Sequence, residues 1–245
     1  MAKRRYSLIL VIAAALRCNA GASPRLTRRT ALIGSVVTST VCVSQRMNLA
    51  FAASASPRDQ MLAAIASDAS ERQVLAAIES LVQVNDGSAA AAARPESLAG
   101  SWRLLWSAGA DKFSPLLGLP RPIRPESVQQ VGDGRVSNVL RFPLGLQARL
   151  SSGLRPTADA SCLEIFPPFK LELLLGGQAR TLVEAGSDAE FRALNARDEA
   201  AQAAPRNLYL QRYVETSGRP GDLRVSTVTA GDPVIVGSVF VHERL

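Results

Sequence analysis

The chain of 245 residues is poor in the side chains on which most enzyme centres depend. It contains one histidine, His242, and three cysteines. A histidine triad, a two-histidine zinc site and a two-histidine iron site cannot be built from a single histidine. The sequence also has no G-x-S-x-G elbow, P-loop or G-x-G-x-x-G fingerprint. We predict a protein that is not an enzyme, with no catalytic residue, metal site or cofactor, and we interpret His242 as a surface residue at a strand end.

Carboxylates are the remaining candidates for acid–base chemistry. Glu164, Glu172, Glu215 and Asp222 lie in or beside predicted strands, and a buried carboxylate with a raised pKa can act as a general base. Alternating glutamates on a strand are more often its solvent face. We therefore interpret these four residues as surface groups.

Acidic residues are absent from residues 1 to 57, which hold eight of the 28 basic residues. The other 20 basic residues face all 21 acidic ones, so the rest of the chain has a net charge near −1. The high isoelectric point thus belongs to the N-terminal segment. The body of the protein offers no excess charge to a phosphate backbone, and we expect no nucleic-acid partner.

The basic N-terminal segment has the layout of a targeting sequence. Lys3, Arg4 and Arg5 precede a short apolar run, and Arg28-Arg29 precede a second one that ends in an A-x-A site at 50–52. Residues 1–56 are therefore predicted to be a secretory-type signal followed by a twin-arginine plastid or thylakoid signal. A single transit peptide is the alternative. Two stacked signals favour a plastid location, associated with thylakoids and compatible with their lumen.

Cysteine usage excludes a disulfide framework in the remaining chain. Cys18 and Cys42 lie in the targeting segment, which leaves Cys162 alone. We interpret Cys162 as a small apolar side chain in a strand, with a reactive thiol as the alternative.

Residues 57–97 are predicted to form a helical pair and a linker. Ser70 followed by Gln73 is a capping-box pattern, which predicts a helix start. Val74, Ile78 and Leu81 then fall on one face of that helix.

Residues 98–245 show an alternation of period two that is typical of β-strands. Gly132-Asp133-Gly134 between two such runs predicts a hairpin, and the polar, alanine-rich stretch 185–207 predicts a long loop or short helix. Eight or nine short strands indicate a barrel or sandwich. The predicted fold is mainly β (α+β): a lipocalin-like antiparallel β-barrel preceded by a short N-terminal helical pair.

Three residues are predicted to close the barrel. Gly100 allows a tight turn into the first strand, and Trp102 two residues later can plug the closed end. Arg224, on a late strand, can lay its guanidinium across that indole. This arrangement resembles the first and last sequence signatures of lipocalin-like barrels.

Longer segments resemble the plastid lipid-associated proteins, also called plastid fibrillins. The resemblance runs from about Met61 to the C-terminus, through LAGSWRLLWSAG at 98–109, GDLRV at 221–225 and GSVFV at 237–241. Trp106 stands where the family's first-strand motif has tyrosine. An additional ETSGRPG separates Tyr213 from Asp222, which departs from the family pattern.

The resemblance implies a protein that binds lipophilic small molecules such as prenylquinones, carotenoids, tocopherols or fatty acids. It also implies a plastid membrane or lipid-droplet surface as partner, at thylakoids or plastoglobules. One alternative is a structural coat protein of such surfaces without a dedicated ligand. A lipocalin-type enzyme is the second alternative.

Two groups of residues are candidates for these contacts. Bulky residues with an inward phase are predicted to line the barrel interior: Trp106, Phe142, Leu150, Phe166, Leu173, Tyr209 and Tyr213. An apolar, proline-rich loop at 113–125 with basic edges is predicted to contact a membrane through Leu116, Leu117, Leu119, Arg121 and Arg124. A loop folded onto the barrel wall is the alternative.

Overall fold

A computed structural model describes residues 55–84, 88–108, 116, 123–194 and 206–245 of the chain. The targeting segment predicted at 1–56 lies almost entirely outside these residues. The described chain divides after Leu81 into two units, a helical one before it and a β-barrel after it.

The helical unit contains α3 (Pro57–Ala66) and most of α4 (Glu71–Gln83). The Ser56 hydroxyl caps α3 by accepting a hydrogen bond from the Asp59 backbone N–H. The predicted capping box before α4 is confirmed, because the Ser70 backbone N–H donates to Oε1 of Gln73 at 3.0 Å. None of the helices that the structure describes is long and apolar enough to cross a membrane.

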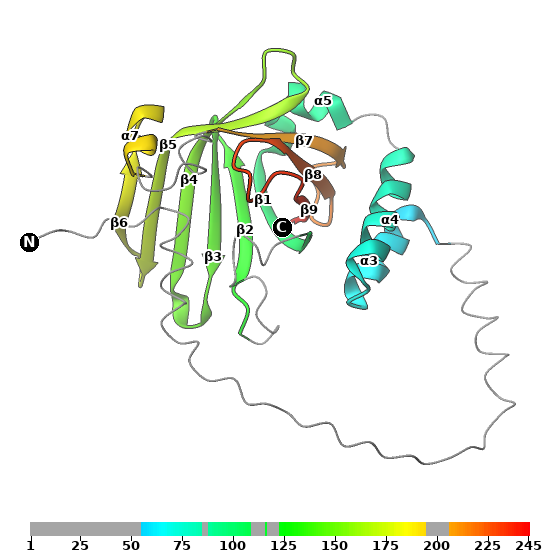
Figure 1. Ribbon diagram of the computed structural model, residues 1–245. Coiled ribbons are helices and arrows are strands. Elements are labelled where there is room, and N and C mark those ends of the chain that lie inside the picture. Colours follow the sequence, from blue (N-terminus) through cyan, green and yellow to red (C-terminus); the bar gives the residue numbers. More distant parts are fainter. Residues whose placement is uncertain (1–54, 85–87, 109–115, 117–122, 195–205) are drawn as a thin grey trace, which may run out of the picture. The chain divides into compact units, whose positions relative to one another are not determined.

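The second unit is built on nine antiparallel strands (Figure 1). Their bounds are β1 Gly100–Ser107, β2 Glu126–Gly132, β3 Arg135–Arg141, β4 Gln147–Pro156, β5 Cys162–Leu175, β6 Gln178–Ala185, β7 Asn207–Val214, β8 Leu223–Ala230 and β9 Val239–Arg244. Short helical segments accompany them in the described part of the chain: α5 Ser88–Ala93, η1 Pro95–Leu98, η3 Pro143–Gly145 and α7 Asp188–Leu194.

Eight of the strands close into a barrel, in the order β1-β2-β3-β4-β5-β7-β8-β9 and back to β1. The long strand β5 makes this closure possible. One of its edges pairs with β4, while the other pairs with β7 through its first residues and with β6 through its last. Strand β6 therefore extends the sheet beside the barrel. The predicted lipocalin-like fold is confirmed.

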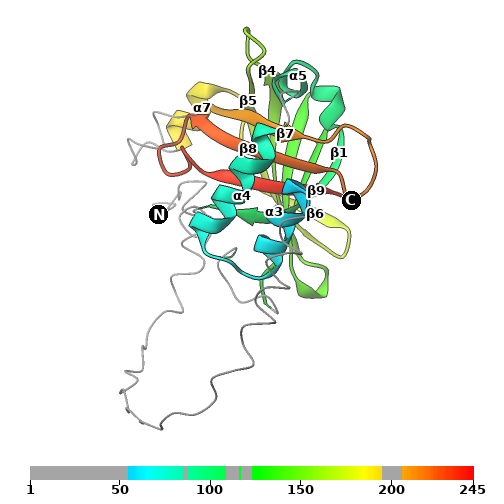
Figure 2. The same cartoon turned by 90° about the vertical axis from the view of Figure 1, so that its right-hand side faces the viewer.

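The two ends of the barrel differ. At the closed end, β1 begins and β2 turns into β3, and Trp102 packs there with Leu98 of η1 and Ala91 and Ala92 of α5. Helix α5 packs against β7 and β5 (Figure 2). At the open end lie the β3–β4 connection and the loop between β8 and β9.

Local sequence explains the turns. Asp133 and Gly134 both have positive φ, 51° and 67°, which is the two-residue hairpin turn predicted between β2 and β3. The polar stretch before β7 contains the short helix α7, as one of the two predicted forms.

Gly100 is required for two reasons at once. Its φ is 125°, a conformation that other residues rarely adopt, and a Cβ there would lie 2.8 Å from Nη1 of Arg244. Gly100→Ala is therefore expected to lower the free energy of unfolding by about 1–3 kcal/mol, measured by urea denaturation. Gly132→Ala is the control, since its Cβ would meet no atom within 4 Å. Equal stability of the two variants would contradict this account of Gly100.

Candidate functional site: the barrel cavity

The barrel encloses a cavity of about 270 Å³. Apolar side chains from six strands line it: Leu104, Val131, Val136, Leu140, Ala148, Leu150, Leu154, Leu163, Ile165, Phe169, Leu171 and Phe240. Polar side chains from β2, β3, β4, β7, β8 and β9 also line the cavity: Ser127, Gln129, Asn138, Ser152, Asn207, Tyr209, Gln211, Arg224, Ser226 and His242. Asp232 and Ile235 of the β8–β9 loop complete it.

Two of the seven residues predicted for the interior, Leu150 and Tyr209, line this cavity. Trp106 does not, because a β-bulge between Leu104 and Trp106 reverses the phase of β1. Leu104 lies opposite the inward His242, whereas Trp106 lies opposite Val241, which alternates outward. Leu104 therefore takes the position in the wall that was predicted for Trp106.

A second bulge explains the error at Tyr213. The register of β7 shifts between Gln211 and Tyr213, so Gln211 lies opposite the inward Ser226 and Tyr213 opposite Val225. The Tyr213 hydroxyl donates to Oε1 of Glu215 and is absent from the cavity wall.

The remaining three predicted residues also lie away from the cavity. Phe166 falls between the inward positions of β5, and its ring contacts the guanidinium of Arg155 at 4.5 Å. Phe142 lies after the end of β3, in the connection to β4. Leu173 has the inward phase but lies beyond the cavity near the end of β5, where 36% of it is exposed.

Trp102 occupies the closed end and is fully buried. Its indole N–H donates to the carbonyl oxygen of Leu98 at 2.8 Å. The guanidinium carbon of Arg224 lies 4.8 Å from the ring centroid, which is the predicted contact. A second cation, Arg244, lies 4.2 Å from the same ring. Arg244 was not among the residues predicted from the sequence to close the barrel, although the alternation along β9 from Phe240 through His242 places it on the inward face.

The two arginines differ in how well their hydrogen-bonding capacity is used. Arg244 donates to the carbonyl oxygens of Ala99 and Ser97 and forms an ion pair with Asp222 at 3.6 Å. Asp222 is itself buried, which corrects its interpretation as a surface group, and it accepts from the Gly218 backbone N–H. Arg244 thereby joins the last strand, β9, to the segment that enters β1 and to the residue before β8.

Arg224 makes fewer polar contacts than Arg244, and only 3% of it is exposed. Its Nη2 donates to Oε1 of Gln129 at 2.5 Å, and its Nε, like that of Arg244, has no hydrogen-bond partner. Burial, with a smaller effect from the charge of Arg244, lowers the pKa of Arg224 to about 9. The side chain is therefore still a cation at neutral pH, and no described carboxylate pairs with it.

His242 is buried in the cavity wall, which corrects its prediction as a surface residue. Burial and the charge of Arg224, its partner across β8 and β9, lower its pKa well below 6.5. The imidazole is neutral at neutral pH, and Nδ1 has no partner. Phe240 lies 6.2 Å away by ring centroids and Tyr209 a further 6.3 Å from Phe240, so three rings line one wall.

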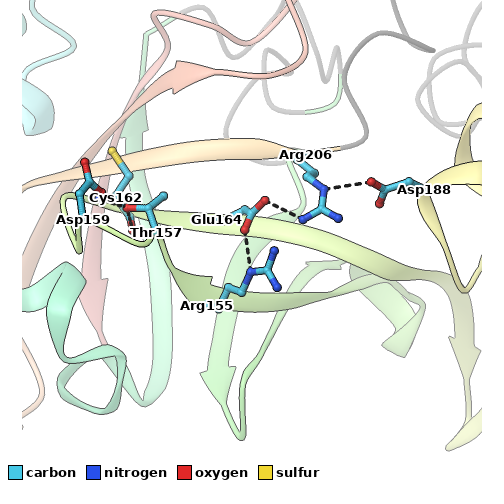
Figure 3. Close-up of polar contacts among 7 residues, drawn as sticks. All are labelled: Arg155, Thr157, Asp159, Cys162, Glu164, Asp188 and Arg206. Atoms are coloured by element: carbon cyan, nitrogen blue, oxygen red, sulfur yellow. Dashed lines mark hydrogen bonds and ion pairs between the residues drawn. The ribbon is translucent and has the colours of Figure 1, made fainter.

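Glu164, considered above as a possible base, belongs to an ion-pair network on the outer face (Figure 3). Arg155 and Arg206 donate to its two oxygens at 2.7 and 2.8 Å, and Arg206 also donates to Asp188 of α7. Burial raises the pKa of Glu164, but the hydrogen bonds and charges of the two arginines outweigh it and lower the pKa overall. Glu164 is thus held ionised, and its structural effect is to join β4, β5 and α7.

Two of the five residues predicted for the membrane-contact loop, Leu116 and Arg124, are among those that the structure describes. Leu116 of the proposed membrane loop is buried, which corrects its assignment to a contact surface. Arg124 is exposed, and Leu117, Leu119 and Arg121 lie outside the described residues.

Cys162 is a buried free thiol at the start of β5. Within the described ranges, no cluster of histidine, cysteine or carboxylate side chains is suited to hold a metal ion.

Comparison with family models, curated proteins and solved structures finds no match to this chain.

The neutral His242 makes stability depend on pH. Because its pKa is lower in the folded chain than in the unfolded chain, stability is lost as pH falls below about 6.5. Urea denaturation between about pH 7.5 and 5.5 is expected to show a decline of up to about 1.4 kcal/mol per pH unit at its steepest. His242→Gln should remove most of that slope. A slope unchanged in the variant would show that other groups cause it.

Proposed function

We propose that this protein is a non-enzymatic carrier of a small lipophilic molecule at a plastid membrane or lipid-droplet surface, as in the plastid lipid-associated proteins that its sequence resembles. The observation that carries the proposal is the cavity inside the barrel. Closed barrels of about eight strands can hold one small ligand, and apolar walls with a few polar groups are typical of such sites. The cavity wall here has an apolar majority, although its polar side chains are more numerous than in such sites.

The size of the cavity restricts the ligand. A volume of about 270 Å³ equals that of roughly nine water molecules in the liquid. A single acyl or prenyl chain of moderate length fits such a space. A carotenoid is several times larger and would have to project from the barrel, so fatty acids and the tails of prenyl lipids are favoured among the predicted ligands.

Exposed apolar residues at the open end support the membrane or droplet surface as partner. Leu144, at the tip of the β3–β4 connection, is 99% exposed, and Ile123, before β2, is 58% exposed. Val234 and Val236 in the β8–β9 loop are also exposed. Large apolar side chains gathered on neighbouring loops are a common feature of surfaces that contact lipid.

The carrier proposal is tested by filling the cavity. Wild-type protein is expected to bind the neutral dye N-phenylnaphthylamine with a rise in dye fluorescence. Ala148→Trp places a large ring in the cavity wall and should abolish that rise. Ala179→Trp is the matched control, because Ala179 is exposed on β6, outside the barrel. Dye binding that survives in Ala148→Trp, with its thermal transition retained, would contradict a ligand site in the barrel.

The surface proposal is tested separately with liposomes of thylakoid galactolipid composition. The double variant Ile123→Ser, Leu144→Ser should float with liposomes at least several-fold less than wild type, because the apolar contact is lost. Leu245→Ser is the control: Leu245 is exposed too, but its backbone N–H donates to Ser101 at the closed end. Equal flotation of all three proteins would contradict contact through the open end. Liposome binding without any dye binding would favour the coat protein instead.

A further inference from the structure

The interior of the barrel contains a buried positive charge that its fold leaves without an anion. The buried carboxylate at the closed end, Asp222, pairs with Arg244. Arg224 instead hydrogen-bonds to the neutral amide of Gln129 and lines the cavity. Burying a charge without a counter-charge is costly, which makes this arginine unusual.

Further unsatisfied polar atoms lie beside Arg224. His242 is its direct neighbour on β9, and Nδ1 of that imidazole has no hydrogen-bond partner. Gln211 lies on β7 opposite Ser226, two residues along β8 from Arg224, and its Oε1 has no partner either. All three side chains are more than nine-tenths buried and contribute to the cavity wall. Native proteins rarely leave so many buried polar atoms unpaired in one place.

The chemistry of these atoms selects the ligand. The guanidinium can only donate, and its charge favours an anion. A neutral imidazole can donate from Nδ1, and the amide of Gln211 can present either its oxygen or its N–H groups. A carboxylate accepts through two oxygens and matches the planar fork of arginine. Asp232, the acidic residue in the wall, belongs to the β8–β9 loop at the open end, where its Oδ1 accepts from the Val234 backbone N–H.

We propose that the cavity binds a single-chain lipid acid, with the carboxylate on Arg224, His242 and Gln211 near the closed end and the chain directed to the open end. This inference rests on the proposed carrier function and narrows its ligand from lipophilic molecules in general to carboxylic amphiphiles. The Tyr209, Phe240 and His242 rings would follow the chain along one wall. Neutral prenylquinones would lack the charged contact.

The experiment compares three ligands with the same chain and different heads. Dodecanoate, dodecanol and dodecylammonium are used to displace N-phenylnaphthylamine from the wild-type chain at about pH 7.5, below the concentrations at which each forms micelles or separates from solution. Dodecanoate is expected to bind about tenfold to a hundredfold more tightly than dodecanol, the range of a hydrogen bond to a charged group. Dodecylammonium should bind most weakly because it meets a like charge.

Two arginine variants form a matched pair. Arg224→Met should retain dye binding and lose the preference for dodecanoate over dodecanol. Arg244→Met removes the other guanidinium from the same indole ring, lowers stability and should retain the preference, because Arg244 is not part of the cavity wall. If Arg224→Met fails to fold, the comparison of the three ligands on the wild-type chain still tests the proposal.

The outcomes separate the two proposals. Dye binding with equal affinity for dodecanoate and dodecanol would overturn the carboxylate site, assign Arg224 to barrel closure alone and leave the carrier proposal standing. Loss of the preference in both arginine variants would also overturn the assignment to Arg224. No binding of dye or of any of the three ligands would overturn the carrier proposal itself.

Discussion

The barrel depends on the contact of one indole ring with two guanidinium groups. Trp102 lies on the first strand, and Arg224 and Arg244 come from β8 and β9, the last two strands. The contact therefore joins the strands that must meet for the sheet to close. The indole N–H also holds Leu98, and Arg244 holds Ser97 and Ala99, so the chain entering the barrel is bonded from both directions. Desolvated cation–π contacts are worth about 2 kcal/mol or more each.

Two cations on one ring also repel each other, and the structure treats them unequally. Arg244 has Asp222 and two carbonyl oxygens, which offset its desolvation. Arg224 has only one amide oxygen. A second cation adds little to barrel closure that an apolar side chain of similar volume would not, since replacing buried ionic groups by apolar ones is often neutral or stabilising. On the proposal above, the presence of an arginine facing the cavity is explained by an anion that the cavity receives.

The sequence alone predicts features that depend on a few neighbouring residues or on a strong pattern. The capping box at Ser70 and Gln73, the turn at Asp133-Gly134 and the alternation along β9 can each be read from a few neighbouring residues. The cavity wall was predicted poorly because the face of the sheet on which a side chain lies depends on the register of the whole strand. The bulges before Trp106 and Tyr213 reverse the phase of two strands, and no glycine or proline marks either position. His242 was misplaced for a different reason: a C-terminal position suggests exposure, whereas barrel closure makes β9 a central strand with neighbours on both sides.

The two ends of the cavity together suggest how a lipid acid would enter. In a membrane, such an acid has its carboxylate at the surface and its chain in the interior. A barrel that meets the surface through the apolar side chains of its open end would therefore receive the carboxylate first. The head would then pass along the cavity toward Arg224, while the chain left the membrane last and lay against the apolar wall. The chain would exchange one apolar environment for another without extended contact with water, and at the end of the route a cation would replace the hydration that the carboxylate loses. On the proposed function, an exposed apolar rim and a buried cation at opposite ends of one cavity would be complementary parts of a single transfer route.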